Sequence, residues 1–303
     1  MNKLTNDVLV VRQKYPLDIK VQMSLHRIKS WYERYNGNVY VAFSGGKDST
    51  VLLHLVRTLF PEVPAVFVNT GLEYPEIYKY IHTVDNVITL HPKRTFKDVI
   101  QKEGYPVISK KVARALRALK SPNSSQAAKD KILYGDERGK YGMLPKKYMY
   151  LINSPFKISE KCCEILKIRP VHKYFKETGR TAYIGTMACD SEHRKRTYLQ
   201  HGCYLTHMYL PACTPIAFWR QEDIWKYIRT KKIPYSNIYD TGVKHTGCIF
   251  CCFGIHMEER PNRFDLMKKS HPKLYKYCME TLKIQQVLQT LGLDSEKGLK
   301  LWE

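Results

Sequence analysis

Between Asn38 and Glu103 the sequence alternates three times between a short apolar run and a segment with helical character. The apolar runs are NVYVAF, PAVFVN and NVITL, and they are rich in β-branched residues, as buried strands are. Strands that alternate with helices at this spacing form βαβ units and a parallel sheet. We therefore predict an α/β fold, a parallel sheet flanked by helices, with a helical elaboration in the C-terminal part.

The expected elements divide the chain into three segments. A helical segment spans residues 1–36, a nucleotide-binding domain spans 37–235 with an insertion at about 109–150, and residues 236–303 hold a CxxC motif and C-terminal helices. The expected strands are Asn38–Phe43, Pro64–Asn69, Asn86–Leu90 and Thr181–Thr186. The expected helices are 18–35, 49–60, 75–83, 96–103, 221–230 and 271–291, and loops are expected at 121–125 and 134–142.

The composition is that of a folded protein with a strong excess of positive charge. Lys and Arg number 50 against 28 Asp and Glu, which gives a formal net charge of +22. Such a charge favours a polyanionic partner, DNA or RNA, although a small anionic substrate or a basic surface that serves solubility would also account for it. No apolar run approaches the ~20 residues of a membrane span, and residues 1–16 show no signal-peptide pattern. We expect a cytoplasmic protein with no membrane partner.

The turn SGGKDS, residues 44–49, follows the first strand and opens a helix. Two adjacent glycines let the backbone turn sharply and approach an anion. Exposed amides at a helix start, with the hydroxyls of Ser44 and Ser49 and the charge of Lys47, can hold phosphate oxygens. Asp48 suits a Mg²⁺ ion or a hydrogen-bonded amide. The spacing differs from that of a GxxxxGK[ST] P-loop, and an ordinary capped glycine turn is the alternative.

In this setting VYVAFSGGKDST resembles the pyrophosphate loop of the adenine nucleotide α-hydrolase superfamily, and within it the phosphoadenosine phosphosulfate (PAPS) reductase family. Three further segments match that family: VFVNTGLEYPEIYKYI, IGTMACDSEHR and AFWRQEDIWKYI. The resemblance implies a Rossmann-like fold and a site for ATP or an adenylyl-sulfate. Asn69 stands where the family usually has Asp, and Met187 and Ala188 stand where reductases usually have arginines. The implied nucleotide-binding residues are Ser44, Gly45, Gly46, Lys47, Asp48, Ser49, Asn69, Thr70, Gly71 and Gly185.

Nine cysteines without a secretion signal indicate free thiols, catalytic groups or metal ligands rather than disulfides. Cys162 and Cys163 are adjacent, and Cys248 and Cys251 form a CxxC motif. This pattern resembles the [4Fe–4S] signature of the adenylyl-sulfate reductase branch, in which four thiolates hold the cluster, and Lys167 matches a lysine near that cluster. A Zn²⁺ site and buried free thiols are the alternatives. Cys252 is a spare thiol, and Cys189, Cys203, Cys213 and Cys278 are expected in the core.

The reductases of the family carry a catalytic cysteine in a C-terminal Glu-Cys-Gly-Leu/Ile-His motif, and this sequence ends in GLDSEKGLKLWE. We therefore expect adenylation: ATP and Mg²⁺ bind at the loop, pyrophosphate leaves, and the activated acceptor, a nucleic acid, receives sulfur from a cysteine desulfurase or another donor. Relatives with this layout occur in phages and bacteria. An adenylyl-sulfate reductase and a non-catalytic sensor or adaptor are the other hypotheses. The expected catalytic residues are Lys47, Asp48, Lys167 and Arg194.

Overall fold

The structure is a computed structural model that describes residues 3–136, 139 and 142–293. Contacts divide the chain into two compact units. Unit 1 consists of residues 1–69, 73–91 and 169–246, and unit 2 of residues 70–72, 92–168 and 247–303. The predicted segment boundaries at 36 and 235 stay a prediction. Part of the expected loop at 134–142, and the end of the chain compared above with the reductase tail, lie outside the described residues.

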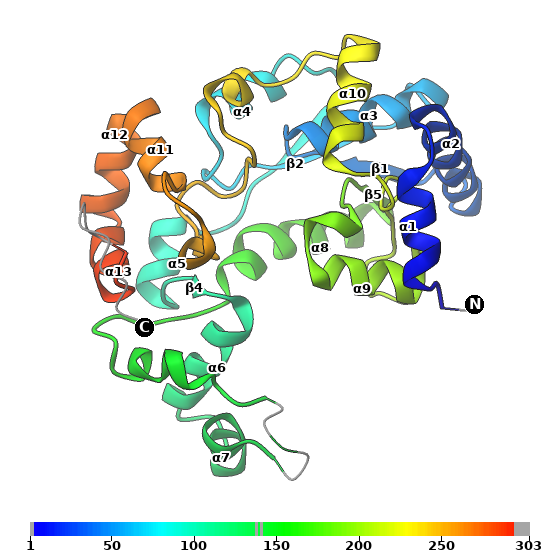
Figure 1. Ribbon diagram of the computed structural model, residues 1–303. Coiled ribbons are helices and arrows are strands. Elements are labelled where there is room, and N and C mark those ends of the chain that lie inside the picture. Colours follow the sequence, from blue (N-terminus) through cyan, green and yellow to red (C-terminus); the bar gives the residue numbers. More distant parts are fainter. Residues whose placement is uncertain (1–2, 137–138, 140–141, 294–303) are drawn as a thin grey trace. The chain divides into compact units, whose positions relative to one another are not determined.

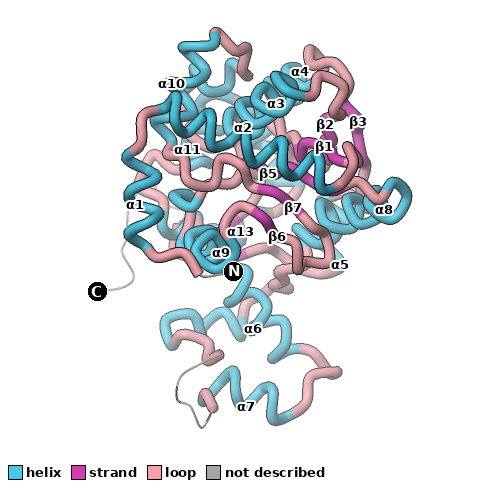
Figure 2. The backbone as a smooth tube through the Cα atoms, turned by 90° about the vertical axis from the view of Figure 1, so that its right-hand side faces the viewer, coloured by secondary structure: helices cyan, strands magenta, loops and turns pink. Residues whose placement is uncertain are grey.

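Unit 1 is built on a six-stranded sheet with the order β3-β2-β1-β5-β7-β6 (Figures 1 and 2). All neighbouring strands are parallel except β6 and β7, which pair in the antiparallel direction. The α/β class with a mostly parallel sheet is thereby confirmed. The strands are β1 (Val39–Ala42), β2 (Ala65–Val68), β3 (Val87–Leu90), β5 (Thr181–Ile184), β6 (Tyr204–Leu205) and β7 (Ala212–Cys213).

Helix α3 (Lys47–Leu59) is the central helix of unit 1, because it packs on both β1 and β5 and is contacted by α2 and α10 (Figure 1). Val51, Leu52 and Leu55 of α3 are fully buried, and this apolar face fixes the start of the helix against the end of β1. Between α2 and α10 a buried ion pair joins Lys20 Nζ to Asp223 Oδ2 at 2.6 Å. The other α-helices are α1 (Asn6–Lys14), α2 (Leu17–Arg34), α4 (Pro75–Ile81), α8 (Arg169–Thr178), α9 (Glu192–His201) and α10 (Gln221–Lys231).

Unit 2 is mainly helical and contains one pair of parallel strands, β4 (Val107–Ile108) and β8 (Cys252–Phe253). The pair brings the chain that follows α5 next to the chain that follows the CxxC motif. The α-helices are α5 (Phe96–Lys102), α6 (Lys110–Lys120), α7 (Gln126–Tyr134), α11 (Arg263–Ser270), α12 (Pro272–Lys276) and α13 (Ile284–Thr290). Wider π-type turns occur at η2 (Glu164–Ile168) and η6 (Tyr277–Thr281), and a 3₁₀ helix, η1, spans Lys146–Asn153.

One sequence expectation is corrected, and the expectation of a parallel sheet, which is confirmed for most of its strands, is refined at one edge. The single helix predicted for 271–291 is wrong, because the segment is divided into α12, η6 and α13. The break lies at Lys283, whose φ of +53° is left-handed and cannot continue an α-helix. The sheet is also not wholly parallel, since the short β6 returns antiparallel beside β7. In the described part of the chain, no helix is both long and apolar enough to span a bilayer.

Candidate functional site

The loop Ser44–Ser49 connects β1 to α3 and is braced by its own serines. Ser49 Oγ donates to Gly46 O at 2.8 Å and accepts a hydrogen bond from Ser44 N at 3.2 Å. Gly45 has a φ of +70°, and a Cβ there would lie 2.9 Å from Ile77 Cγ2 and from Ile81 Cγ1 of α4. Glycine is therefore required at position 45 by the backbone and by the close approach of α4.

The first turn of α3 presents backbone amides that the helix cannot satisfy itself. Gly46 is the N-cap residue and has no side chain to cap them. Lys47 N instead donates to the hydroxyl of Tyr239 at 2.8 Å. The partial positive charge of a helix N-terminus makes this turn suitable for an anion.

Lys47 and Asp48 form a charged pair at this turn. Only 2% of Lys47 is exposed, and its Nζ lies 3.2 Å from Asp48 Oδ1. Burial raises the pKa of Asp48, although Lys47 opposes that effect; the nearby Asp190 raises it further and His245 lowers it. Asp48 Oδ1 is buried, and its contact with Lys47 Nζ is an ion pair without hydrogen-bond geometry. The charge of this oxygen is therefore balanced within the loop by Lys47.

Gly185 follows β5 and lies against the first turn of α3. A Cβ at Gly185 would lie 3.1 Å from Asp48 O and 3.2 Å from Ser49 N. The chain leaves β1 toward β2 on one side, while β5 pairs with β1 on the other side. This is the point where the strand order reverses, and parallel α/β sheets bind ligands at such points. The structure thus brings together two sequence motifs that lie far apart in the chain.

The segment Asn69–Gly71, expected to line the nucleotide, crosses from one unit to the other. Asn69 ends β2, and its amide donates to Leu90 O at 2.9 Å. Thr70 is buried and belongs to unit 2, where its hydroxyl accepts a hydrogen bond from Leu72 N at 3.3 Å. Ile249 N in turn donates to Leu72 O at 2.9 Å, so this turn lies beside the CxxC motif.

Arg194 and Ser191 make local contacts in the structure. Ser191 caps α9, accepting a hydrogen bond from Arg194 N at 3.3 Å. The guanidinium of Arg194 binds the carboxylate of Asp190, which also accepts a hydrogen bond from Gln221 Nε2 at 3.0 Å. The sequence analysis missed Asp190, although its place just before a capped helix was visible in the sequence. Arg194 is therefore held by a carboxylate that lies four residues earlier in the chain, just before the N-cap of α9.

The four motif cysteines all belong to unit 2. Cys162 and Cys163 form a helical turn directly before η2, and Cys251 N donates to Cys248 O at 3.1 Å in the CxxC turn. Burial raises the pKa of the Cys162 thiol; Cys163, Cys248 and Cys251 raise it further, and Lys167 lowers it. The four thiols therefore lie within electrostatic reach of one another.

The side chains around these thiols are not in a metal-binding arrangement in the described part of the chain. Within residues 3–136, 139 and 142–293, no group of three or more His, Cys, Asp or Glu side chains is arranged to hold one. Burial raises the pKa of Cys251 to about 11. Arg263, which the sequence analysis missed, donates from Nη1 to Cys251 O at 3.0 Å and from Nε to Glu258 at 2.7 Å. Arg263 thus ties α11 to the CxxC turn.

The remaining cysteines are mostly buried, as expected. Cys203, Cys213 and Cys278 are buried, and so is the spare thiol Cys252 on β8. Cys189 is the exception, since it is exposed and not in the core. It lies in the short 3₁₀ turn η3 (Ala188–Asp190), and that turn does not continue the buried strand β5.

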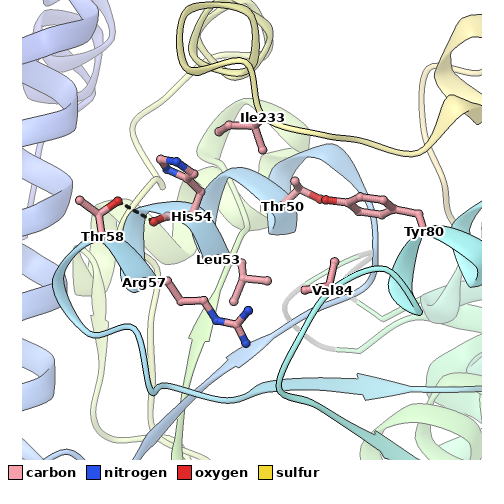
Figure 3. A pocket seen from close by; sticks show the side chains of 8 residues that line it. All are labelled: Thr50, Leu53, His54, Arg57, Thr58, Tyr80, Val84 and Ile233. Carbon is pink, nitrogen blue, oxygen red and sulfur yellow. Dashed lines mark hydrogen bonds between the residues drawn. The ribbon is translucent and has the colours of Figure 1, made fainter.

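A pocket of about 300 Å³ lies on one face of α3 (Figure 3). His54, at its edge, makes a 3.0 Å hydrogen bond with the hydroxyl of Tyr227, and Arg57 donates to the carbonyl oxygens of Val63 and Asn86. The pocket does not include the loop residues. Its lining residues are Thr50, Leu53, His54, Arg57, Thr58, Tyr80, Val84 and Ile233.

Comparisons with known proteins agree with the motifs. The profile of the phosphoadenosine phosphosulfate reductase domain family matches residues 38–130 and 136–253. An uncharacterized protein of Methanocaldococcus jannaschii is 26% identical over 98% of this chain, but the match spans about half, 52%, of that relative's length. The adenosine 5'-phosphosulfate reductase of Geobacillus kaustophilus is 25% identical over 79% of this chain and 83% of its own length.

Two solved structures are similar at a lower level. The PAPS reductase of Candida auris, in complex with phosphate, has a TM-score of 0.46 and 16% identity, and the match covers 81% of this chain and 96% of that chain. The U34-tRNA thiolase of Methanococcus maripaludis with its [4Fe–4S] cluster has a TM-score of 0.40 and 14% identity, with 90% and 80% covered.

Proposed function

This chain belongs to the phosphoadenosine phosphosulfate reductase domain family, and on that premise we propose that it is an ATP-dependent adenylating enzyme that serves sulfur transfer to a nucleic acid. The observation that carries the proposal is the loop at the end of β1, where two glycines, paired serines and a helix N-terminus meet Lys47 and Asp48. Such a turn suits the phosphates of a nucleotide. The proposed nucleotide-binding residues are those of the loop Ser44–Ser49 and Gly185. Asn69, Thr70 and Gly71, which follow β2, are proposed as further residues that line the nucleotide.

In the proposed reaction an acceptor oxygen attacks the α-phosphorus of ATP, the bond to the bridging oxygen breaks, and pyrophosphate leaves. The loop amides and Lys47 stabilise the charge that develops on the leaving phosphates. Mg²⁺ would be held by Asp48, because carboxylate oxygens are ligands that Mg²⁺ prefers, and it would neutralise phosphate charge; Asp48 Oδ1 now lies 3.2 Å from Lys47 Nζ. Arg194, which is oriented by Asp190, is the second proposed catalytic cation of unit 1. A sulfur nucleophile then displaces AMP from the activated acceptor.

The cysteines Cys162, Cys163, Cys248 and Cys251 are the proposed ligands of a [4Fe–4S] cluster. Their chemistry fits, because four thiolates are the ordinary ligands of such a cluster and these four thiols act on one another electrostatically. When bound, the cluster would supply a site that holds sulfide. Lys167, which acts on Cys162, would offset the negative charge of the thiolates. Zn²⁺ is the second candidate for the same four ligands.

The proposed acceptor is a nucleic acid, and a cysteine desulfurase or a similar protein is the proposed sulfur donor. The net charge of +22 supports a polyanionic acceptor. Helix α6 carries several exposed basic side chains on its solvent face, while Val112, Ala113 and Leu116 form its buried face. The exposed basic residues of α6 are Lys110, Lys111, Arg114 and Lys120.

Pyrophosphate release tests the adenylation step. We expect the protein to release pyrophosphate from ATP and Mg²⁺, faster with nucleic acid present, and we expect Lys47→Ala to lose at least about a hundredfold, as removal of a main charge-stabilising group does. The matched control is Lys29→Ala, because Lys29 is an exposed lysine of α2 paired with Glu33. An unchanged rate in Lys47→Ala would remove the loop from the mechanism.

Metal analysis after anaerobic purification tests the cluster. We expect a brown protein that absorbs broadly near about 400 nm, and we expect Cys162→Ser and Cys248→Ser to lose iron. Cys278→Ser is the control, since Cys278 is a buried thiol outside the set. A colourless protein with stoichiometric zinc, or iron retained by both variants, would contradict the assignment.

An adenylyl-sulfate reductase is the second candidate, and the names of relatives such as the Geobacillus kaustophilus enzyme support it. That reaction needs a thiolate nucleophile that transfers two electrons to sulfur. Among the nine cysteines, all in the described part, Cys189 is the one exposed residue. Its sulfur is nevertheless partly covered, and this desolvation, followed by the charge of Asp190, raises its pKa to about 11. Such a thiol is a weak nucleophile at neutral pH. Sulfite released from adenylyl-sulfate in the presence of a dithiol reductant would favour this candidate.

A further inference from the structure

Three hydroxyl groups surround Gly46 at the start of α3. A Cβ placed on Gly46 would lie 2.9 Å from Thr246 Oγ1 and 3.3 Å from both Ser44 Oγ and the Tyr239 hydroxyl. Ser44 belongs to the loop itself, whereas Tyr239 and Thr246 come from a distant part of the sequence. The three hydroxyls occupy the space around Gly46, so a side chain at this position would clash with them.

The Tyr239 hydroxyl is already held at two points. It accepts a hydrogen bond from Lys47 N at 2.8 Å, and it lies 3.0 Å from Thr246 Oγ1. Its ring is packed edge-on against Trp225 of α10, with centroids 5.4 Å apart, and Lys47 Nζ lies 5.7 Å from the ring centroid. The hydroxyl is therefore fixed in place at the helix N-terminus before any ligand binds, and little freedom is lost when it makes another bond.

A phenolic hydroxyl has one hydrogen to donate and can also accept. Because the Tyr239 oxygen accepts from Lys47 N, its hydrogen is available to Thr246 or to another acceptor in the same site. A phosphate oxygen is a stronger acceptor than a threonine hydroxyl, since hydrogen bonds to charged groups exceed neutral ones. Two consecutive hydrogen bonds, from Lys47 N to the Tyr239 oxygen and from the Tyr239 hydroxyl to phosphate, would also polarise each other. The phosphate would then interact with the positive end of the α3 dipole through Tyr239.

We propose that Tyr239 is a phosphate-positioning residue: its hydroxyl, fixed by Lys47 N, donates its hydrogen to a phosphate oxygen of the bound nucleotide in place of Thr246. Thr246 is the partner that holds this hydrogen when no phosphate is bound. The inference rests on the proposed function, because it assumes that the Ser44–Ser49 loop binds the nucleotide. It adds a side chain that the loop motif does not contain.

Binding of pyrophosphate and of ATP, each measured by calorimetry, tests the proposal. We expect Tyr239→Phe, which keeps the ring, to weaken both affinities by about tenfold or more, as loss of a hydrogen bond to a charged group does. Thr246→Ser should bind as the unaltered protein does. The matched control is Tyr227→Phe, because Tyr227 is a buried tyrosine of the same unit whose hydroxyl binds His54. The thermal midpoint of each variant is measured alongside.

Equal or tighter binding by Tyr239→Phe, with a normal thermal midpoint, would overturn the proposal and leave Tyr239 as a cap of α3 or a competitor of phosphate. If Tyr239→Phe does not fold, Thr246→Val decides: the proposal expects a loss of affinity of no more than about threefold, since Thr246 gives up its bond on binding. A larger loss there would show that Thr246, not Tyr239, contacts the phosphate. Failure of the unaltered protein to bind either ligand would instead reject the proposed function itself.

Discussion

At the scale of single residues, glycine can be required by a positive φ or by the close approach of neighbouring atoms. Two glycines of unit 1 allow these two requirements to be distinguished. Gly45 and Gly242 both have positive φ, +70° and +88°. A Cβ at Gly45 would meet Ile77 and Ile81 at 2.9 Å, whereas a Cβ at Gly242 would meet nothing within 4 Å. A residue with a side chain would have a strained backbone at both positions, and it would clash with neighbouring atoms at position 45 but not at position 242.

We expect Gly242→Ala to lower the free energy of unfolding by about 1–2 kcal/mol, the cost of a left-handed conformation for an L-residue. Gly45→Ala should cost about 1–3 kcal/mol more, because the added methyl group overpacks the contact with α4. Urea unfolding of both variants measures the difference. Equal costs would show that α4 moves away freely and that the loop tolerates a side chain.

At the scale of elements, α3 is joined to α10 by the hydrogen bond between His54 Nδ1 and the Tyr227 hydroxyl. Burial lowers the pKa of His54 from its ordinary value of 6.5, and the charge of Lys231 lowers it further. The folded protein therefore favours the neutral imidazole, and the unfolded chain binds the proton more readily below pH 6.5. The stability that this gives is present above 6.5 and is lost as the pH falls through the lowered pKa.

We accordingly expect thermal midpoints to fall as the pH is lowered from about 7 to 5, and part of that fall should disappear in His54→Gln. Glutamine stays neutral across the range and fits the same half-buried position. His193→Gln, on α9, is a suitable control, since it changes a histidine without touching the α3–α10 contact. Identical pH profiles for His54→Gln and the unaltered protein would contradict the lowered pKa of His54.

Two arginines of helix α6 converge on one acidic residue of unit 2, Glu160, whose side chain is 10% exposed. Arg117 binds it through two nitrogens, Nε at 3.0 Å and Nη2 at 2.7 Å, whereas Arg114, 74% exposed, reaches it with one nitrogen at 3.4 Å. We expect Arg117→Ala to lower the free energy of unfolding by about 1–3 kcal/mol, because a nearly buried carboxylate loses its main partner. Arg114→Ala should cost less than about 0.5 kcal/mol, and urea unfolding compares the two; equal values would show that Glu160 is adequately solvated.

At this scale the sequence predicted those elements whose residue pattern within a short segment is sufficient to specify them. The strand before SGGKDS and the helix after it follow from a β-branched run, two glycines and an apolar helix face. The break at Lys283 was missed because a lysine carries no local signal for positive φ. The contact of Tyr239 with Lys47 N was missed because tertiary packing alone brings these residues together. The antiparallel β6 was missed because a two-residue strand has no periodicity.

At the scale of the whole molecule, a net charge of +22 remains after every Asp and Glu has been counted against a Lys or Arg. Ion pairs within the chain therefore cannot neutralise it. A phosphate backbone would neutralise such charge and release its condensed counterions, so affinity should fall steeply as salt rises. We expect binding of a short duplex DNA and of a single-stranded RNA, with a linear fall of the logarithm of affinity against that of salt concentration.

If the basic face of α6 contacts the phosphates, the double variant Lys110→Ala, Lys111→Ala should reduce the slope by about 0.7–0.9 for each phosphate contact that is lost. The matched control is Lys29→Ala, Lys173→Ala, which removes the same charge from exposed lysines of α2 and α8 that already pair with Glu33 and Glu177. A general effect of net charge would change both slopes equally, and that result would contradict a role for α6. A lower slope in the α6 variant alone, with pyrophosphate binding unchanged, would place nucleic-acid binding on unit 2 and keep it separate from the phosphate loop of unit 1.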